Sequence, residues 1–415
     1  MKSKDSKIKN IVFLHPFLVR LGGSEKLMME GVKYFKQRDI KTHILTFQFD
    51  PEEFRDFDLL RNADVQVIGS GFLYPASYLG RGILSPFLAL ALRRKIGKIK
   101  PDIIISQEWV GSVYLYFATL SSSFSYVTNI YETMFRSDTN PLRYAHIHGK
   151  VFHELRESTP GGKEFISLNR PNRNLIWNML VEMAAVVARR AIRKARKIFV
   201  LSNQMKREIS KLYDREATVV RGGIPREILT YKPKQDIKKK LGISNQRVIL
   251  NVNRLIPRKR VDLLIKAFGK LSNCFKDVVL VIGGTGPEEE NLKNLAKDLG
   301  IADRVKFVGF IKEGELWDYY AGCDVFAHLN WADFALAPLE ALALQKKVVW
   351  TTEMETDEFL AQNKHIFVAE PTVNDAARAL EEALTTEVTE KNDLSNYASD
   401  MYFERLSQEL PLLLG

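Results

Sequence analysis

Short apolar runs alternate with helical patterns along most of this chain, and this alternation restricts the fold more than any other feature. In the first half, strands are predicted at 11–14, 42–47, 64–68, 102–106, 124–130, 197–202 and 217–220. Helices are predicted between them at 26–35, 82–99, 175–197 and 203–212, the last with Ser202 as its cap. Apolar runs this short are typical of parallel strands buried on both faces, and their alternation with helices indicates a doubly wound α/β sheet.

A second series of the same kind begins after residue 247. Its predicted strands lie at 248–252, 278–283, 305–308, 325–327, 348–351 and 366–368, and its helices at 260–271, 288–299, 314–321 and 372–385. The charged stretch 226–247 between the two series has the composition of a linker. A chain of 415 residues also exceeds one ordinary core. We therefore expect two doubly wound Rossmann-like domains that face each other across a cleft, residues 1–222 and 223–396, with an amphipathic tail at 397–415 that packs back on the first domain.

The formal net charge of +11 indicates an anionic partner. Nucleic acid is not expected, because the chain has no zinc-ligand spacing, RNA-binding sheet signature or helix-turn-helix pattern. One basic cluster, Arg93–Lys100, follows the apolar stretch Leu84–Leu92, and a second lies at Arg189–Lys197. Apolar residues that lead into basic ones are typical of a helix on an anionic membrane surface. The pattern around 84–100 equally suits a core-packed helix whose basic end lies in water.

The number of cysteines and the N-terminal sequence indicate the cellular compartment of the protein. Only Cys274 and Cys323 are present, so no disulfide framework or cysteine-based metal site is predicted and a reducing compartment is expected. The apolar run Ile11–Leu14 is too short for a signal peptide, and no window has the length and composition of a transmembrane helix. We expect a cytoplasmic protein without metal or cofactor, with peripheral binding to the cytoplasmic membrane face as an open alternative.

Three loops at the expected carboxyl ends of strands suit a phosphorylated ligand. Arg254 ends the first strand of the second series, and Lys259 follows it just before a helix. A guanidinium fork and an ammonium there suit a pyrophosphate, although Arg258–Arg260 can also be a solvated basic turn. The glycine-rich loop Gly283–Gly286 either lets backbone approach a ligand or makes a tight turn. The pair Gly22–Gly23 opens a helix and can present backbone N–H groups to an anion.

The segment Asp324–Gln345 combines a strand end, a polar and aromatic loop and a helix. This arrangement is where α/β sheets bind phosphorylated ligands. Glu340 is expected in the first turn of the helix, where its carboxylate can accept hydrogen bonds from the hydroxyls of a sugar. The alternative is that this carboxylate only complements the helix dipole.

These segments resemble the family 4 glycosyltransferases, which are retaining enzymes of the GT-B fold. The resembling pieces occur in family order and cover most of the chain: GGSEKL at 22–27, FVLSNQMKREI at 199–209, VVRGGIP at 219–225, NRLIPRKRVDLLIKAF at 253–268, GGTGPEEENL at 283–292, VKFVGFI at 305–311 and FALAPLEALAL at 334–344. The N-terminal HPFLVRLGGSEKL looks most like the dolichol-type mannosyltransferases that act on lipid-linked oligosaccharides.

The resemblance implies that a hexose of the mannose or glucose type moves from a nucleotide-diphosphate sugar to a glycan or lipid-linked acceptor. It implies retention and no metal, because cations and helix dipoles stabilise the departing diphosphate. Arg254, Lys259 and Asp333 would be catalytic, with the two cations on the diphosphate and Glu340 on the ribose. The other implied donor-binding residues are Gly22, Gly23, Gly284, Phe310, Ile311, Leu336, Ala337 and Leu339, and the acceptor-side residues are His15, Tyr131 and Glu132.

Four departures from the family pattern lie around the expected donor-sugar and acceptor pocket. Ala332 stands where the first glutamate of the E-x7-E signature falls, and Tyr131 stands where histidine is frequent. The usual glycine is missing at 344–347, and the usual Gly-Gly is replaced at 353–355. Asp333 or Glu355 can substitute for the missing carboxylate.

These departures keep a second hypothesis open, a degenerate relative that binds a nucleotide sugar as a partner subunit without transferring it. A third hypothesis, an NAD-dependent dehydrogenase, needs a GxGxxG motif with a downstream acid. Neither half of the chain has one.

Overall fold

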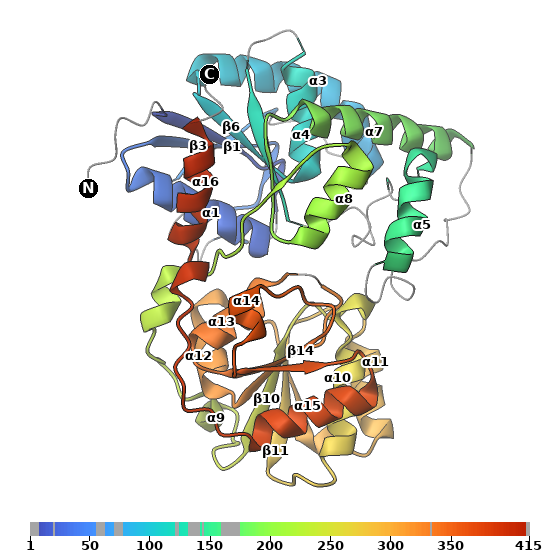
Figure 1. Ribbon diagram of the computed structural model, residues 1–415, viewed down its shortest axis with the longest axis vertical. Helices are drawn as coiled ribbons and strands as arrows, with labels where there is room; N and C mark the ends of the chain where they lie inside the picture. The colour runs from blue at the N-terminus through green and yellow to red at the C-terminus, as the bar shows by residue number, and fades with distance from the viewer. Residues whose placement is uncertain are drawn as a thin grey trace. The chain divides into compact units, whose positions relative to one another are not determined.

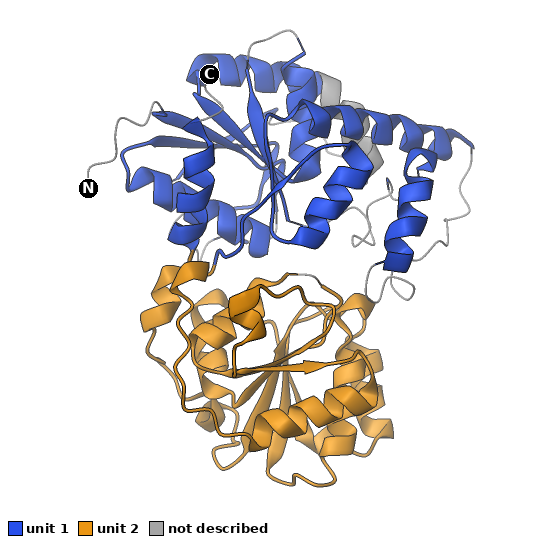
Figure 2. Cartoon of the chain, in the orientation of Figure 1, with its two compact units in different colours: residues 1–223, 399–415 blue, residues 224–398 orange. Residues whose placement is uncertain are grey.

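The computed structural model describes residues 8–19, 21–54, 63–69, 78–120, 124–131, 142, 145–158, 175–332 and 334–411, apart from the side chains of 78–86. The chain forms two compact units (Figure 2). Unit 1 contains residues 1–223 and 399–415, and unit 2 contains residues 224–398. Each unit is a parallel sheet with helices packed on it (Figure 1), which confirms the predicted doubly wound α/β class.

Unit 1 holds a seven-stranded sheet in the order β5-β3-β1-β6-β7-β8-β9. The strands are β1 (Asn10–Leu14), β3 (Lys41–Thr46), β5 (Asp64–Val67), β6 (Ile103–Gln107), β7 (Tyr126–Ile130), β8 (Ile198–Val200) and β9 (Thr218–Val219). Ile11 of β1 pairs in parallel with Thr42 on one side and Ile103 on the other. The interiors of β1, β6 and β7 are buried, as the continuous apolar runs predicted.

The main helices of unit 1 are α1 (Gly23–Lys36), α3 (Tyr78–Ile99), α4 (Glu108–Ala118), α5 (Gly149–Ser158), α7 (Leu175–Lys194), α8 (Asn203–Tyr213) and α16 (Ser399–Glu409). The predicted cap of α8 is confirmed, because the Ser202 side chain accepts from the Met205 N–H at 3.0 Å. The C-terminal helix α16 packs on α1. A Cβ on Gly31 of α1 would lie 2.6 Å from the Phe403 ring, and Ser399 Oγ donates to Glu30 Oε2 at 2.8 Å.

Unit 2 holds a six-stranded sheet in the order β12-β11-β10-β13-β14-β15, again with parallel neighbours. Its strands are β10 (Arg247–Val252), β11 (Val278–Gly283), β12 (Val305–Gly309), β13 (Val325–His328), β14 (Lys347–Thr351) and β15 (Ile366–Ala369). Its helices are α9 (Ile237–Lys240), α10 (Val261–Leu271), α11 (Glu289–Asp298), α12 (Glu313–Gly322), α13 (Leu336–Ala343), α14 (Glu358–Ala361) and α15 (Val373–Thr385). Apolar clusters fill both faces of the sheet.

The stretch 226–247 is not a linker, which corrects the expectation from its charge. It contains α9 and packs into unit 2, where Ile237 is part of the core. Lys238 Nζ lies 2.8 Å from Asp324 Oδ2, and Tyr231 Oη donates to Asp318 Oδ1 at 2.8 Å. Two of its lysines, Lys238 and Lys240, therefore pair with carboxylates of the unit.

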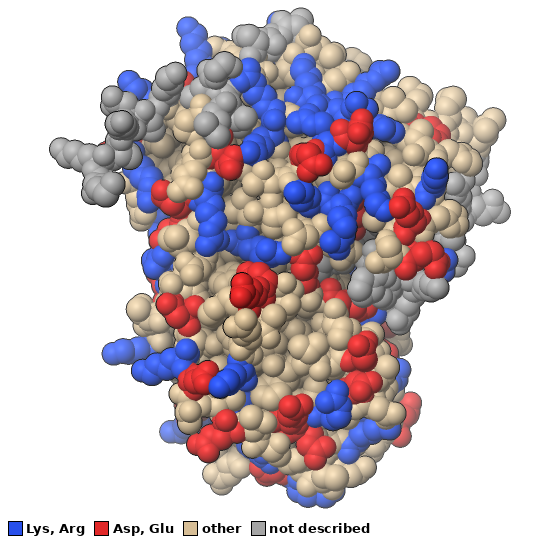
Figure 3. Space-filling view, viewed as in Figure 1, with Lys and Arg blue, Asp and Glu red and all other residues tan. Residues whose placement is uncertain are grey.

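Across the residues described here, no helix has both the length and the apolar character that are needed to cross a bilayer. Lysine and arginine gather on the part of unit 1 that faces the viewer in Figure 3.

Candidate functional site

The carboxyl edge of the unit 2 sheet has a topological switch point between β10 and β13. From β10 the chain moves outward to β11 and β12, and it then crosses back to β13 on the other side of β10. Loops that leave such a point in opposite directions open a crevice in which α/β proteins bind ligands. Asn253 and Arg254 follow β10 here, and Asn330 follows β13 closely.

Lys259 lies in the loop after β10, and Asn330, which follows β13, holds it at this switch point. With its amide oxygen turned toward the cation, Asn330 accepts from Lys259 Nζ at 3.0 Å and from His328 Nε2 at 3.3 Å. The Asn330 amide nitrogen then donates to the Lys259 carbonyl oxygen at 3.1 Å. The side-chain amide atoms of Asn253 lie 2.9 and 3.1 Å from those of Asn330, so the Asn253 amide turns over together with that of Asn330 to keep each donor facing an acceptor. The ammonium group is therefore fixed in place, whereas Arg254 is exposed at the end of β10.

His328 supports Lys259 as a neutral imidazole. Its side chain is buried, and burial together with the charge of Lys259 lowers its pKa to about 3. Because Nε2 donates to Asn330, Nδ1 carries no proton, and Nδ1 has no hydrogen-bond partner within the described residues. His328 was not among the predicted site residues, because a histidine at the end of a buried strand usually belongs to the core.

The pKa of His328 predicts acid sensitivity. Between pH 6.5, the usual pKa of a histidine, and about pH 3, the unfolded chain binds a proton at this residue that the folded chain does not bind. Stability therefore falls as the pH drops through this window, by about 1.4 kcal/mol per pH unit for this group. When the pH is lowered from 6.5 to 5, the free energy of unfolding should fall in both proteins. We expect the fall to be about 2 kcal/mol smaller in His328→Gln than in the wild type. Urea unfolding at both pH values measures this, and equal losses in the two proteins would contradict it.

Glu340 lies in the second turn of α13, not in the first as predicted, because the helix begins at Leu336. Helical side chains lean toward the N-terminus, so the carboxylate still reaches back over the first turn. Glu340 is buried, and it accepts a hydrogen bond from Tyr320 on α12. Burial and the charge of Glu340 raise the pKa of Tyr320 well above its usual value. The tyrosine therefore stays protonated and orients the carboxylate.

Among the described residues, no side chain caps the first turn of α13. Its N-cap residue is Ala335, and Pro338 at the third helical position has no N–H. The orphan donors of the turn are therefore the backbone N–H groups of Ala335, Leu336 and Ala337. Leu339 is different, because its side chain is buried in the unit 2 core. An uncapped helix N-terminus at a switch point suits an anionic group.

The glycine-rich loop after β11 packs against the loop that carries Arg254. Gly284 has a φ of +121°, and a Cβ there would lie 1.8 Å from the Asn253 carbonyl oxygen. The Leu255 N–H donates to the Thr285 carbonyl at 2.9 Å, and the Glu288 N–H donates to the Leu255 carbonyl at 3.1 Å. The glycines are thus required for close approach of neighbouring backbone. They position the loop that carries Arg254. This packing explains why a glycine is needed at position 284, and no bound ligand is required to explain it.

The two residues expected near the base differ in exposure. Phe310 directly follows β12 and is 75% exposed. Ile311 is buried, and its Cδ1 lies 2.4 Å from the place of a Cβ on Gly283. Of these two residues, Phe310 is therefore the one with a large exposed surface.

Arg260 forms a buried ion pair, which corrects the alternative of a solvated basic turn at 258–260. Its guanidinium and the Glu353 carboxylate make a bidentate contact, with Nη2 to Oε1 at 3.0 Å, and their side chains are only 4% and 1% exposed. Thr351 Oγ1 also donates to Glu353 Oε2 at 2.9 Å. The pair joins the loop after β10, which carries Lys259, to the loop after β14. Sequence reasoning missed it because the partners are 93 residues apart.

In unit 1, the predicted residues lie at the carboxyl ends of β1 and β7 and at the start of α1. His15 Nε2 lies 3.1 Å from Glu25 Oε1 of α1. Burial acts to raise the pKa of Glu25, but the hydrogen bond and charge of His15 outweigh it, and that pKa is lowered. A Cβ on Gly22, the N-cap of α1, would lie 2.8 Å from Glu25 Oε2, whereas Gly23 has open space beside it. The carboxylate of Glu25 therefore already occupies the neighbourhood of this helix N-terminus.

Tyr131 is tied into the end of β7. Its hydroxyl accepts from Asn129 Nδ2 at 3.0 Å, and its N–H donates to Glu108 Oε1 at 3.3 Å. Burial and the neighbouring Tyr402 of α16 raise the pKa of Tyr131. Gln107, which ends β6, is a polar residue that the sequence analysis did not name. It is fully buried, and neither amide atom has a hydrogen-bond partner within the described residues.

Two predicted site residues, Glu132 and Asp333, lie outside the described residues.

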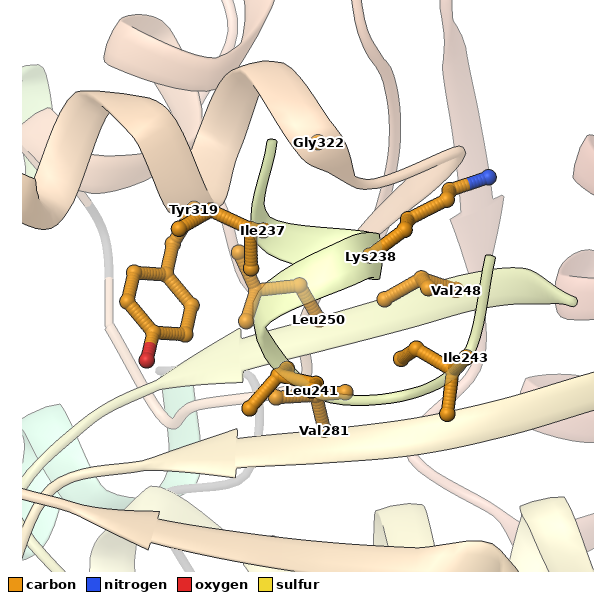
Figure 4. A pocket seen from close by; sticks show the side chains of 9 residues that line it. All are labelled: Ile237, Lys238, Leu241, Ile243, Val248, Leu250, Val281, Tyr319 and Gly322. Atoms are coloured by element: carbon orange, nitrogen blue, oxygen red, sulfur yellow. The ribbon is translucent and has the colours of Figure 1, made fainter. Parts of the chain in front are cut away.

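A cavity in unit 2 lies apart from these groups. It is lined by Ile237, Lys238, Leu241, Ile243, Val248, Leu250, Val281, Tyr319 and Gly322 (Figure 4). The lining is apolar except for Lys238 and the hydroxyl of Tyr319, and no predicted site residue contributes to it. The cavity is a packing gap beneath α9 and α12.

Two family models together match most of the chain. The model described as Glycosyltransferase Family 4 matches residues 21–227, and the model described as Glycosyl transferases group 1 matches residues 233–401. The chain belongs to the family 4 glycosyltransferases. Its two doubly wound units are those of the GT-B fold, as predicted.

One relative and two solved structures of other proteins are reported for this glycosyltransferase, and the structures bear on its fold alone. A GDP-mannose-dependent alpha-(1-6)-phosphatidylinositol monomannoside mannosyltransferase of Mycolicibacterium smegmatis is 38% identical over 91 residues, which is 22% of this chain and 24% of that protein. The match thus spans about a quarter of the relative's length. Anabaena HepE in complex with UDP-glucose has a TM-score of 0.66 at 18% identity and covers 98% of each chain. Sucrose-phosphate synthase of Thermosynechococcus elongatus has a TM-score of 0.69 at 15% identity, over 98% of this chain and 97% of that one.

Proposed function

We propose that this glycosyltransferase moves a hexose of the mannose or glucose type, with retention, from a nucleotide-diphosphate sugar to a glycan or lipid-linked acceptor. The observation that carries the proposal is the fixed ammonium of Lys259 at the β10/β13 switch point. Asn330 and neutral His328 hold it there, and the uncapped start of α13 follows on the same loop. A preorganised cation and a helix N-terminus together stabilise negative charge on a departing diphosphate.

Each group has a distinct task in this proposal. Lys259 and Arg254 bind the diphosphate, Lys259 as a fixed point charge and Arg254 as a fork that closes on the ligand. Glu340, oriented by Tyr320, accepts from the ribose hydroxyls. The bond from the sugar to the diphosphate breaks, the acceptor oxygen bonds to the same face, and the leaving phosphate takes the acceptor proton. The cations carry the developing charge, so we propose that no metal is required.

The names of the similar proteins limit the candidates for the donor's sugar and its nucleotide base. The mycobacterial relative is named for GDP-mannose, and HepE was solved with UDP-glucose. We therefore propose GDP-mannose or a UDP-hexose as the donor. The lipid-linked class of acceptor is supported by the same relative, whose name includes a phosphatidylinositol monomannoside.

A donor screen tests the proposal. Thermal unfolding is followed with GDP-, UDP- and ADP-sugars in the presence of EDTA, and donors that raise Tm are then incubated with glycan and lipid-linked acceptors. We expect one nucleotide class to raise Tm and to give a product whose anomeric linkage matches the donor. Inversion of the linkage, or activity that EDTA abolishes, would refute the corresponding part of the proposal.

The degenerate partner subunit remains the second candidate, because Ala332 replaces the glutamate that the family pattern places there. It predicts the same rise in Tm but no product with any acceptor, and no hydrolysis of the donor. Product formation by the isolated chain excludes it.

Glu340→Gln tests the ribose contact. We expect it to raise the Kd for the nucleoside diphosphate about thirtyfold, because a hydrogen bond to a charged group contributes about 2 kcal/mol. Tyr320→Phe is the matched control, since it keeps the carboxylate but removes the group that orients it. We expect a smaller loss for Tyr320→Phe in the same calorimetric titration. Unchanged binding in Glu340→Gln would show that the ribose lies elsewhere.

A further inference from the structure

The helix α7 carries a stripe of large apolar side chains on its outer face. Leu175, Ile176, Met179, Met183 and Val186 recur at helical spacing, and all are exposed, Leu175 at 83% and Met183 at 58%. The inner face of the helix is separately apolar, with Val181, Ala185, Ala188 and Ile192 buried in unit 1. The outer stripe is therefore not needed to hold the helix on the sheet.

The same outer face becomes basic toward the end of the helix. Arg190 and Arg193 continue the line of Met183 and Val186 at steps of three and four residues, and both are exposed. The only acid in α7 is Glu182, and it accepts a hydrogen bond from the His146 N–H. One helix face thus has an apolar first half and a cationic second half.

The neighbouring helix α3 repeats this pattern. Phe87 and Leu90 are 71% and 53% exposed, and Arg94 and Lys98 follow on the same line. α3 contains no Asp or Glu, and it contacts α7. In α3, as in α7, the exposed apolar side chains of the described residues therefore precede the exposed basic ones along the helix. In Figure 3 the basic side chains gather on this part of unit 1, with a mostly uncharged surface beside them.

The described part of residues 84–100 has a buried and an exposed face. Leu88, Leu92 and Ile96 are buried, so this part of α3 packs on the core. Phe87 and Leu90 are the only large apolar side chains of the described residues in that stretch that are exposed, and α7 supplies the larger exposed apolar surface.

We propose that the outer faces of α3 and α7, which we call the α3–α7 face, dock on an anionic lipid bilayer. The exposed apolar side chains of α7, with Phe87 and Leu90 of α3, enter the boundary between headgroups and acyl chains, and the exposed basic residues of both helices meet anionic headgroups. Charge selects this occupant over a second copy of the chain, because pairing two such faces would bring like charges together. The proposal is independent of which donor is used and whether transfer occurs.

Vesicle flotation of the full chain tests the α3–α7 face. Binding is compared on phosphatidylcholine vesicles and on vesicles that also contain phosphatidylglycerol, at low and at higher salt. We expect binding only to the anionic vesicles, weakened by salt. Arg94→Gln with Arg190→Gln should weaken it about 25-fold, since one basic residue near an anionic surface contributes about fivefold. Ile176→Ser with Met183→Ser should also weaken binding several-fold, because less apolar surface enters the bilayer. Both side chains are exposed, so we expect the fold to be kept.

The matched control removes the same charge elsewhere. Lys276→Gln with Lys297→Gln changes two exposed lysines of unit 2 and should leave binding within about twofold of the wild type. If this control lost as much vesicle binding as Arg94→Gln with Arg190→Gln, net charge alone would explain the binding. That result would contradict the proposal that the α3–α7 face docks on the membrane. Binding that is the same with and without anionic lipid would also overturn it. So would a dimer in sedimentation that Ile176→Ser with Met183→Ser converts to a monomer, because the stripe would then cover a second copy.

Discussion

Lys259→Ala is expected to lower kcat for sugar transfer about a hundredfold to a thousandfold, the loss typical of removing one preorganised group that stabilises charge in a transition state. The reason lies in how the cation is held. Lys259 Nζ is fixed by the Asn330 amide oxygen at 3.0 Å, and burial keeps the adjacent His328 neutral, so no reorganisation is needed as charge builds on the diphosphate. Initial rates at saturating donor measure the effect.

The readouts for Lys259→Ala separate catalysis from binding. We expect the Kd of the nucleoside diphosphate to rise much less than kcat falls, because Arg254 and the α13 N-terminus still bind the ground state. Lys266→Ala is the control, since Lys266 is an exposed cation on α10 that pairs with Asp262 at 3.0 Å, and it should be nearly silent. A Lys259→Ala enzyme with wild-type kcat would remove the switch-point cation from the mechanism.

The positions of these residues were predictable because local pattern decides them. A short apolar run followed by Asn253 and Arg254 defines β10 and its mouth, and the Ser202 cap defines the start of α8 without reference to the rest of the chain. Right-handed crossovers then limit how parallel strands of this kind can be connected. This is why the fold class was predicted from sequence.

The errors and omissions depend on contacts that are distant in sequence. Residues 226–247 looked like a linker because the acids that neutralise their lysines lie in α12 and beside β13. Glu340 was misplaced by one turn because nothing in the sequence marks Ala335 as the cap. The outer stripe of α7 was not seen because both faces of that helix are apolar, and periodicity cannot say which face is buried.

The buried ion pair of Arg260 and Glu353 could not be predicted from the sequence, because its partners are also distant along the chain. Breaking this pair is expected to lower the stability of the protein strongly. Glu353→Gln is expected to lower the free energy of unfolding by about 3–5 kcal/mol, because it leaves the Arg260 charge buried without its carboxylate. Arg260 also has a φ of +48°, a left-handed conformation that non-glycine residues adopt at a cost. The bidentate contact therefore holds both a charge and a strained backbone in place. Urea unfolding of unliganded protein measures the loss.

Two further variants identify the cause of that loss. Asp277→Asn breaks the exposed pair with Arg247, 2.7 Å apart, and should cost less than about 1 kcal/mol. Arg260→Gly combined with Glu353→Gln removes the buried charge and relieves the left-handed backbone, so it should recover a large part of the stability that Glu353→Gln loses. Because the pair ties the Lys259 loop to the loop after β14, the double variant should still show reduced kcat. A double variant as unstable as Glu353→Gln would mean that packing around residue 353, and not the unpaired arginine, sets the cost.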